Sequence, residues 1–444
     1  MECERVLAAE TASHLNQRVV VEGHVEALRR LGSLAFLKLR DRSGTIQLVV
    51  DNPQLISELN RLNLESTIRA RATVSPHPSN HGEVELKVLE VEILSSAVEV
   101  LPVEVHKESK VDALSSSSMF DYRPLTLRSR KARAIFRIEA AICQAFRSFL
   151  NGEGFTEIHS PKIVSTGTEG GAQLFQVDYF GKSAYLAQSP QFYKQIMVGV
   201  FERVYEIGPV YRAEEHDTTR HLNEYLSMDL EMGFITSAQD LMDLQVRLLK
   251  YIFEYLAEHS APELSCFNAS VPNLTSIPQI TLEEACQLVN QEVRSNSGTK
   301  CDTRESVQGN DLDPEGERLL CEVIERRHGC PFVFITQYPS TVRPFYAMPL
   351  PHGKLTDSFD LLFRGLEVTT GGQRIHSYTQ MKASLVKRGL DPAAFADYLQ
   401  CFRYGMPPHG GLAIGLERLT KQLLGLASVK LASLFPRDRN RISP

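Results

Sequence analysis

Residues 201–234 read FERVYEIGPVYRAEEHDTTRHLNEYLSMDLEMGF, and this stretch predicts a β-hairpin. Residues 204–211 form an apolar run, which is typical of a strand. After a polar loop, residues 225–232 alternate in character as a second strand does. Asp229 and Glu231 lie two positions apart on that strand, so both side chains point to the same face.

The hairpin carries the charges of a phosphate clamp. Arg212 follows the first strand, and Arg220 and His221 stand in the loop. An arginine holds a planar, permanently charged fork that can bind two phosphate oxygens at once. The residues alone also allow an exposed hairpin held by salt bridges, which is the commoner fate of mixed charges. Features elsewhere in the chain favour the phosphate clamp.

Three motifs, in order along the chain, resemble those of the class II aminoacyl-tRNA synthetases. Residues 154–161 (GFTEIHSP) look like motif 1, the hairpin looks like motif 2, and residues 411–419 (GLAIGLERL) look like motif 3. Residues 188–195 (QSPQFYKQ) narrow the resemblance to aspartyl-tRNA synthetases of the shorter, archaeal type. The resemblance covers essentially the whole chain and implies an ATP-dependent enzyme that charges tRNA.

The expected fold class is α+β, with two domains and a connection. Residues 1–101 predict an OB-fold β-barrel, because five short strands with a helix after the third have the order of that fold. Residues 102–130 form the connection, and the serine run at 115–118 is typical of a hinge. Residues 131–444 would form the class II catalytic domain, an antiparallel sheet flanked by helices. A polar segment at 295–316 predicts a mobile insertion without an assigned function.

The predicted barrel has a locally basic region that suits RNA. Phe36 stands among five basic residues between positions 29 and 42, where it could stack a base or simply pack in the core. The resemblance implies that Phe36 stacks an anticodon base and that Gln47 reads the central uracil. The strands are expected at residues 18–25, 34–40, 45–50, 68–75 and 84–94, with the helix at 53–62.

Composition limits the location of the protein and its chemistry. The 444 residues carry a net charge of −6, which argues against bulk nucleic-acid binding but allows a local basic patch. No run of about 18 apolar residues is present, and the N-terminus has no signal-peptide core, so no membrane association is expected. The eight cysteines form no CxxC pair and predict reduced thiols in a cytoplasmic protein without structural zinc.

The resemblance implies a two-step reaction that begins with ATP and Mg²⁺. The aspartate α-carboxylate would attack the α-phosphorus of ATP, and a terminal ribose hydroxyl of tRNA would then accept the aspartyl group. Arg212 would hold the α-phosphate, Arg220 and His221 the γ end, and Arg418 a terminal phosphate or the adenine face. Glu367 matches a Mg²⁺ ligand, and Thr370 stands where serine is expected. The implied ATP-binding residues are Arg212, Ala213, Glu214, Arg220, His221, Leu222, Glu367, Gly415, Leu416, Glu417 and Arg418.

Recognition of aspartate needs cations for its side-chain carboxylate, and Lys194 and Arg374 are the candidates. An arginine fork discriminates against asparagine, because an amide cannot reciprocate it. Asp229 would either fix these two cations or bind the substrate ammonium, and the resemblance gives the ammonium to Glu169. The implied aspartate-binding residues are Glu169, Gln191, Lys194, Arg212, Asp229, Thr370 and Arg374, and the implied catalytic residues are Arg212, Glu367 and Arg374.

Two positions of the predicted barrel concern the choice of tRNA. The anticodons of tRNA(Asp) and tRNA(Asn), GUC and GUU, differ only in the third base. In relatives that accept only tRNA(Asp), we expect a tryptophan at the end of the first strand and a lysine in the loop between the last two strands. This chain has His24 and Pro78 there, which predicts that both tRNAs are charged.

Three alternatives stay open at this point. The enzyme could be strictly specific for tRNA(Asp), or it could be an archaeal-type asparaginyl-tRNA synthetase, which would share all three motifs. A third alternative is an inactive relative that only binds RNA. We also expect a C2 homodimer joined through motif 1, in which Pro161 resembles the family's interface proline.

Overall fold

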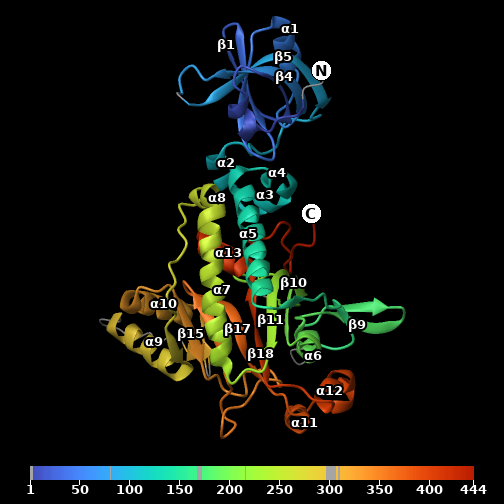
Figure 1. Cartoon of the computed structure of the whole chain (residues 1–444), viewed down its shortest axis with the longest axis vertical. Helices are drawn as coiled ribbons and strands as arrows, with labels where there is room; N and C mark the ends of the chain where they lie inside the picture. The colour runs from blue at the N-terminus through green and yellow to red at the C-terminus, as the bar shows by residue number, and fades with distance from the viewer. Residues whose placement is uncertain (1–3, 81, 168–172, 216, 297–306, 309–310) are drawn as a thin grey trace. The chain divides into compact units, whose positions relative to one another are not determined.

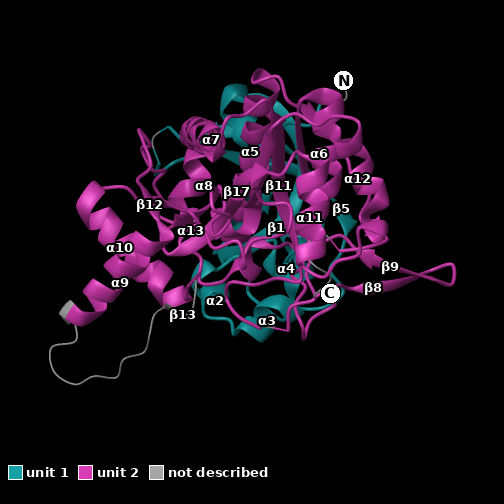
Figure 2. Ribbon diagram, turned by 90° about the horizontal axis from the view of Figure 1, so that it is seen from below, with its two compact units in different colours: residues 1–130 teal, residues 131–444 magenta. Residues whose placement is uncertain are grey.

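The computed structural model describes residues 4–80, 82–167, 173–215, 217–296, 307–308 and 311–444. The chain divides into two compact units, Met1–Arg130 and Lys131–Pro444, which are coloured separately in Figure 2. In the described ranges, no helix combines the length and the apolar character that a membrane span requires. The six cysteines within them are free thiols.

The first unit contains the predicted OB-fold barrel, closed in the order β1-β2-β3-β5-β4. Alternation builds it: in β4, Ile68, Ala70, Ala72 and Val74 are fully buried and the residues between them face outward. The first strand is longer than predicted, because a bulge between Val25 and Ala27 lets it leave β4 and continue along β2. The elements are η1 (Ala8–His14), β1 (Arg18–Leu31), β2 (Leu34–Arg40), β3 (Thr45–Val50), α1 (Pro53–Leu59), β4 (Thr67–Pro76) and β5 (Val84–Ser95).

The connection predicted at residues 102–130 contains three short helices, α2 (Glu108–Asp112), α3 (Ser116–Asp121) and α4 (Arg123–Thr126). The serine run there caps and begins a helix, and the interpretation of the connection as a hinge stays a prediction. Ser115 accepts a hydrogen bond from the backbone N–H of Ser118 at 3.1 Å and caps α3. Serine is a preferred N-cap residue, so a run of serines can mark the start of a helix as well as a linker.

The second unit is built on an eight-stranded sheet in the order β12-β15-β16-β17-β18-β11-β10-β6. Its neighbouring strands are antiparallel except for the two outermost pairs, β12/β15 and β6/β10. A separate three-stranded sheet has the order β7-β9-β8, and its strands fall between β6 and β10 in the sequence. The strands are β6 (Thr156–Glu157), β7 (Ile163–Val164), β8 (Gln176–Tyr179), β9 (Lys182–Leu186), β10 (Arg203–Tyr211), β11 (Glu224–Gly233), β12 (Gln279–Thr281), β15 (Phe332–Thr336), β16 (Ser358–Phe363), β17 (Leu366–Arg374) and β18 (His409–Gly415).

Two long amphipathic helices, α5 (Arg130–Gly152) and α7 (Ala238–His259), run side by side and cover one face of this sheet (Figure 1). Met228 and Leu230 of β11 point into the core that these helices close. Because side chains alternate along a strand, the residues between them face the opposite side of the sheet. That opposite face carries the candidate site. The other helices are α6 (Gln191–Phe201), α8 (Ala261–Ser265), α9 (Leu282–Asn296), α10 (Pro314–His328), α11 (Tyr378–Lys387), η2 (Pro392–Phe395), α12 (Ala396–Arg403), α13 (Leu416–Leu424) and η3 (Val429–Ala432).

The polar segment at 295–316, predicted as a mobile insertion, contains regular structure where it is described. A two-residue β-ladder joins β13 (Val307–Gln308) to β14 (Asp311–Leu312), and residues 297–306 and 309–310 lie outside the description. Asp313 then caps α10, whose apolar side packs with α9 against β15. Sequence polarity missed these elements because the ladder is short and the helix begins with charged residues.

Candidate active site

The site begins as a row of polar side chains on β11. Ser227, Asp229 and Glu231 share the face that points away from the helical core. Cross-strand pairing places Asp229 beside Ala413 and Glu231 beside Gly411 on β18. The small residues of motif 3 thus leave space above the carboxylates of motif 2.

A buried cluster of two cations and two anions lies at one end of this row. Lys194 of α6 donates from Nζ to Asp229 Oδ1 at 2.9 Å and lies 3.4 Å from Glu231 Oε2. Arg374 of β17 donates from Nε to Glu231 Oε1 at 3.1 Å and from Nη2 to the Gly411 carbonyl at 3.0 Å. All four charged side chains are at most 7% exposed. Their charges compensate one another, which a buried ion cluster requires.

This arrangement changes the role expected of Asp229. It contacts Lys194, but Glu231 is the residue that contacts both Lys194 and Arg374. Burial lowers the pKa of Arg374, but the Glu231 carboxylate outweighs it, and the net direction is upward. Arg374 therefore stays charged, and these contacts engage two of its five N–H donors.

Gln191 belongs to a hydrogen-bonded chain behind the cluster. Its Nε2 donates to Gln195 Oε1 at 3.0 Å, and the Gln195 amide lies 2.9 Å from His409 Nε2. Burial lowers the pKa of His409, so the ring is neutral at physiological pH. Tyr398 also donates to Gln195, at 2.9 Å. The buried amides therefore hold α6, and with it Lys194, at a fixed depth.

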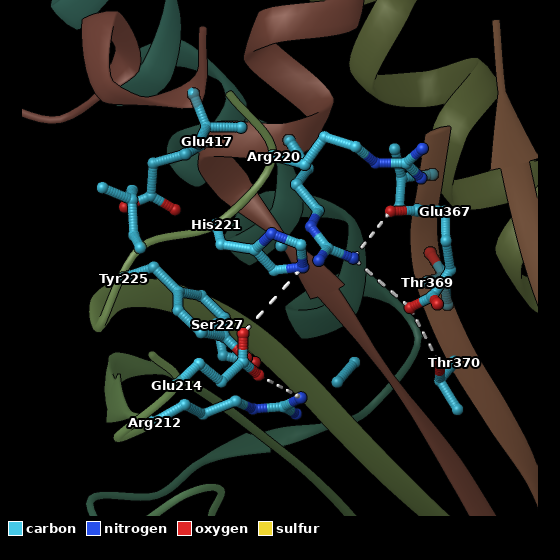
Figure 3. A pocket seen from close by; sticks show the side chains of 16 residues that line it. Arg212, Glu214, Arg220, His221, Tyr225, Ser227, Glu367, Thr369, Thr370 and Glu417 are labelled. Carbon is cyan, nitrogen blue, oxygen red and sulfur yellow. Dashed lines mark hydrogen bonds and ion pairs between the residues drawn. The ribbon is translucent and has the colours of Figure 1, made fainter. Parts of the chain in front are cut away.

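A cavity opens beside the buried cluster and gathers the phosphate-binding and magnesium-binding candidates from the loop between β10 and β11, from β17 and from α13 (Figure 3). Ser227 joins the two sites, since it lines the cavity and donates to Asp229 Oδ2 at 2.5 Å. Two of the residues predicted to bind ATP do not line the cavity: Leu416 is buried in the core, and Ala213 lines a neighbouring cavity. The predicted residues that line it are Arg212, Glu214, Arg220, His221, Leu222, Glu367, Thr370, Gly415, Glu417 and Arg418.

The cationic side chains of the cavity are held by acidic partners. Arg212 lies 3.9 Å from Glu214 Oε1, with its guanidinium over the ring of Tyr225. Arg220 reaches across to form an ion pair with Glu317 of α10. Burial raises the pKa of Glu317 to about 7, although Arg220 opposes the shift. These contacts order long side chains before a ligand arrives.

A bulge in the sheet brings the two candidate magnesium ligands together. Glu367 and Thr370 are three residues apart and would face opposite sides of a regular strand, but Val368 is the extra residue of a bulge. Thr370 consequently donates from Oγ1 to Glu367 Oε1 at 3.1 Å. Arg418 donates to the Glu367 carbonyl at 3.1 Å. Among the described residues, no three acidic, histidine or cysteine side chains gather as a ready-made metal site.

Two other acidic groups support this end of the cavity. Glu417 accepts from the backbone N–H of Leu226 at 3.0 Å, which fixes α13 to β11, and burial raises its pKa to about 7. Asp360 forms a buried ion pair with Arg343 at 2.7 Å. Burial raises the pKa of Asp360, and the Arg343 guanidinium opposes the shift.

The remaining predicted residues lie elsewhere. Glu169, expected to meet the substrate ammonium, lies outside the described residues. Phe36 and Gln47 line a cavity of about 600 Å³ on the barrel, so the alternative that Phe36 packs in the core is wrong. Neither His24 nor Pro78 lines that cavity. His24 lies within β1, where its Nδ1 contacts the Glu65 carbonyl at 3.2 Å.

Comparison with known families fits both units. A family model described as "tRNA synthetases class II (D, K and N)" matches residues 115–439, which include the cavity and the buried cluster. The chain belongs to this family. It is therefore an aminoacyl-tRNA synthetase, a class of enzyme that uses ATP as a substrate. A second model, of an OB-fold nucleic acid binding domain, matches residues 19–94 of the synthetase.

Individual relatives cover the whole synthetase. A protein of Deinococcus radiodurans named aspartate–tRNA(Asp/Asn) ligase is 48% identical and covers 99% of each chain. A protein of Thermococcus kodakarensis named aspartate–tRNA(Asp) ligase is 39% identical over 98% of this chain and 99% of its own. The crystal structure of an asparaginyl-tRNA synthetase from Pyrococcus horikoshii has a TM-score of 0.89 and 28% identity, over 99% of this chain and 100% of its own.

Sequence reasoning assigns no role to two residues of the site. The spacing from Asp229 places Glu231 on the correct face but does not show how deeply it is buried. Glu317 gives no signal, because it lies 97 residues from Arg220 and directly after the polar segment at 295–316.

Proposed function

We propose that this synthetase joins L-aspartate to tRNA through an aspartyl-adenylate. The observation that carries the proposal is the pair of buried cations, Lys194 and Arg374, beside a cavity lined with arginines. The relative from Deinococcus radiodurans, which is named for aspartate, supports it. Asparagine would present amide N–H groups to the N–H donors of Arg374 and leave them unpaired, which strongly disfavours it.

In the first step, an oxygen of the aspartate α-carboxylate attacks the α-phosphorus of ATP, and the bond to the β-phosphate breaks to release pyrophosphate. Negative charge develops at the α-phosphate, where Arg212 stands at the edge of β10. Arg220 and His221 bind the γ end of ATP, and Arg418 binds a terminal phosphate or the adenine face. The substrate supplies the nucleophile, so the protein contributes through positioning and preorganised charge.

Magnesium fits the Glu367 and Thr370 pair. Mg²⁺ prefers oxygen ligands and is usually held by one or two carboxylates together with substrate phosphates and water. The pair offers one carboxylate and one hydroxyl within 3.1 Å of each other at the cavity wall. When bound, the ion would neutralise charge on the ATP phosphates. Arg418 Nη1 lies 3.5 Å from Glu367 Oε1 and so restricts the orientation of that carboxylate.

In the second step, a terminal ribose hydroxyl of tRNA attacks the aspartyl carbonyl, and AMP leaves. The barrel binds the anticodon, with Phe36 stacking a base and Gln47 reading the central uracil. We propose that both tRNA(Asp) and tRNA(Asn) are charged, in the cytoplasm, and the name of the Deinococcus relative supports this. Restoring the residues of specific enzymes with His24→Trp and Pro78→Lys would shift the preference toward tRNA(Asp) if these positions decide it.

We also propose a C2 homodimer through α5 and β6. Strand β6 forms one edge of the large sheet, and an edge leaves backbone groups available for a partner. Two-fold dimers are the commonest closed oligomers. A monomeric mass in sedimentation at micromolar concentration, with full activity, would contradict this proposal.

ATP–pyrophosphate exchange tests the amino acid. Exchange that depends on aspartate and not on asparagine is the expected result, whereas the reverse would favour an asparaginyl enzyme, like the Pyrococcus protein whose structure this chain resembles. No exchange with either amino acid would favour an inactive RNA-binding protein. Aspartylation of purified GUC and GUU tRNAs then tests the choice of tRNA, and a preference for GUC of about a hundredfold would end the proposal that both are charged.

A further inference from the structure

We propose that Lys430 is a positioning residue for ATP: through it, the C-terminal segment (residues 428–441) holds Arg220 and His221 against the outer phosphates. The inference rests on the proposed function, in which these two side chains bind the γ end of ATP. It is carried by the contacts between the C-terminal segment and the hairpin loop (residues 212–223), which joins β10 to β11.

The C-terminal segment is attached to the base of the hairpin loop. The side-chain amide of Asn223 closes the base by donating to the carbonyls of Arg212 and Glu214, at 2.7 and 2.9 Å. The backbone N–H of Asn223 donates to the Arg437 carbonyl at 2.8 Å, and Glu224 and Arg437 pair as a single antiparallel bridge. The segment therefore runs beside the start of β11.

The same segment holds the far part of the hairpin loop. Lys430 Nζ donates to Asp217 Oδ1 at 2.6 Å and Asn440 Nδ2 donates to Asp217 Oδ2 at 2.8 Å, so both oxygens of this carboxylate are engaged. The backbone N–H of Val429, which lines the cavity, donates to the Thr219 carbonyl at 3.0 Å. Within the described residues, the hydrogen bonds that join residues 217–219 to the chain outside the hairpin loop all go to the C-terminal segment.

Lys430 is itself held in place. Its Nζ lies 2.6 Å from Asp438 Oδ2, and the Lys430 and Asp438 side chains are only 16% and 7% exposed. Burial lowers the pKa of Lys430, but its hydrogen bonds to Asp217 and Asp438 outweigh burial, and the net direction is upward. An exposed ion pair contributes little because its two side chains move freely. Lys430 is instead a charged group fixed between one carboxylate of the segment and one of the hairpin loop.

Thr218 connects this contact to the phosphate-binding side chains. It directly follows Asp217, and its Oγ1 accepts a hydrogen bond from the backbone N–H of Arg220 at 3.1 Å and lies 2.6 Å from His221 Nδ1. Arg220 and His221 both line the cavity. The place of Asp217 thus sets the place of Thr218, which sets the backbone of one phosphate-binding residue and the ring of the other. Release of Asp217 should therefore weaken binding of the outer phosphates and leave the buried cluster for aspartate unchanged.

The test is ATP–pyrophosphate exchange with the full chain, from which KM is obtained for ATP, for pyrophosphate and for aspartate. Lys430→Met keeps an unbranched stem and removes the charge. It should raise the KM values of ATP and pyrophosphate together, by about 10- to 100-fold, since small misplacements of binding groups cost this much. Pyrophosphate is included because it carries the β- and γ-phosphates of ATP. The aspartate KM should be unchanged, and Lys430→Arg, which keeps a cation, should restore most of the loss.

Two further variants separate the contact from the stability of the segment. Asp217→Ala removes the same ion pair from the half-exposed side of the hairpin loop and leaves Asp438 paired, so it should reproduce the loss even where Lys430→Met folds poorly. The double variant should be no worse than either single one, because both remove one interaction. The matched control is Arg439→Met, which removes a cation of the same segment that is 60% exposed and 4.0 Å from Glu215. It should keep the wild-type KM values.

Unchanged KM values in Asp217→Ala would overturn the inference, and so would a rise in the aspartate KM that matches the rise for ATP and pyrophosphate. An equal loss in Arg439→Met would also overturn it, because the effect would then not depend on Lys430. Exchange that needs asparagine in place of aspartate would overturn the proposed amino acid instead. The comparison of the ATP and pyrophosphate KM values, made with asparagine, would still decide the role of Lys430.

Discussion

Replacing Arg374 with leucine should separate aspartate binding from ATP binding. The variant removes the donor to Glu231 Oε1 and the donor to the Gly411 carbonyl. Glu231 would stay buried with only Lys194 near it, at 3.4 Å. Removing one partner of a buried pair costs about 3–5 kcal/mol of stability. The substrate carboxylate would lose its planar partner as well.

The size of the expected loss of aspartate affinity follows from the same geometry. Truncating one member of a buried, hydrogen-bonded charge pair weakens binding by about 2–5 kcal/mol, or roughly 30- to 5,000-fold. ATP–pyrophosphate exchange, measured over a range of aspartate and of ATP concentrations, gives both KM values. We expect the loss in the aspartate KM, with little change in the ATP KM, because Arg374 does not line the cavity that gathers the phosphate-binding residues.

Arg40→Leu is a matched control for loss of stability. Arg40 donates two hydrogen bonds to the buried Glu65 carboxylate, at 2.8 and 2.7 Å. In the variant, Arg128 would still lie 2.9 Å from that carboxylate, just as Lys194 would still lie near Glu231 in Arg374→Leu. Both variants therefore leave a buried carboxylate with one cation. Arg40→Leu should lower the thermal midpoint without raising the aspartate KM. An Arg374→Leu enzyme that keeps its aspartate KM and loses ATP affinity would refute the assignment.

Three further predictions concern the cavity. Arg212→Ala should lower kcat for exchange by about 100-fold or more, because a preorganised donor at the α-phosphate acts in the transition state; near-normal exchange would remove Arg212 from the mechanism. Glu317→Gln should raise the ATP KM several-fold by releasing Arg220, whereas Glu322→Gln, on the same helix but paired with Arg318, should not. Glu417 has its folded pKa raised from 4.5 to about 7, so the folded state holds this proton more tightly and stability falls as pH rises between those values. Glu417→Gln should remove on the order of 3 kcal/mol of that decline, visible in unfolding at pH 5 and pH 8.

The sequence by itself determined the elements whose signal is local. Strands expected at residues 204–211 and 225–232 occupy Arg203–Tyr211 and Glu224–Gly233 in the structure. The OB-fold order was predictable for the same reason, because apolar alternation and turn residues act within a few positions. Motifs 2 and 3 contain most of the residues that line the cavity, since chemistry that binds phosphate needs particular residues at particular places on short segments.

Only the tertiary structure decided which charges meet. Glu231 became the shared partner of Lys194 and Arg374 because three elements converge on one face of the sheet and exclude water there. The Glu367 and Thr370 pair depends on a bulge, which arises from a shift in the pairing register of β16 and β17. His77 and Gln47, 30 residues apart, come within 3.4 Å of each other because the barrel closes. Such contacts depend on burial and long-range pairing, which spacing along the chain does not encode.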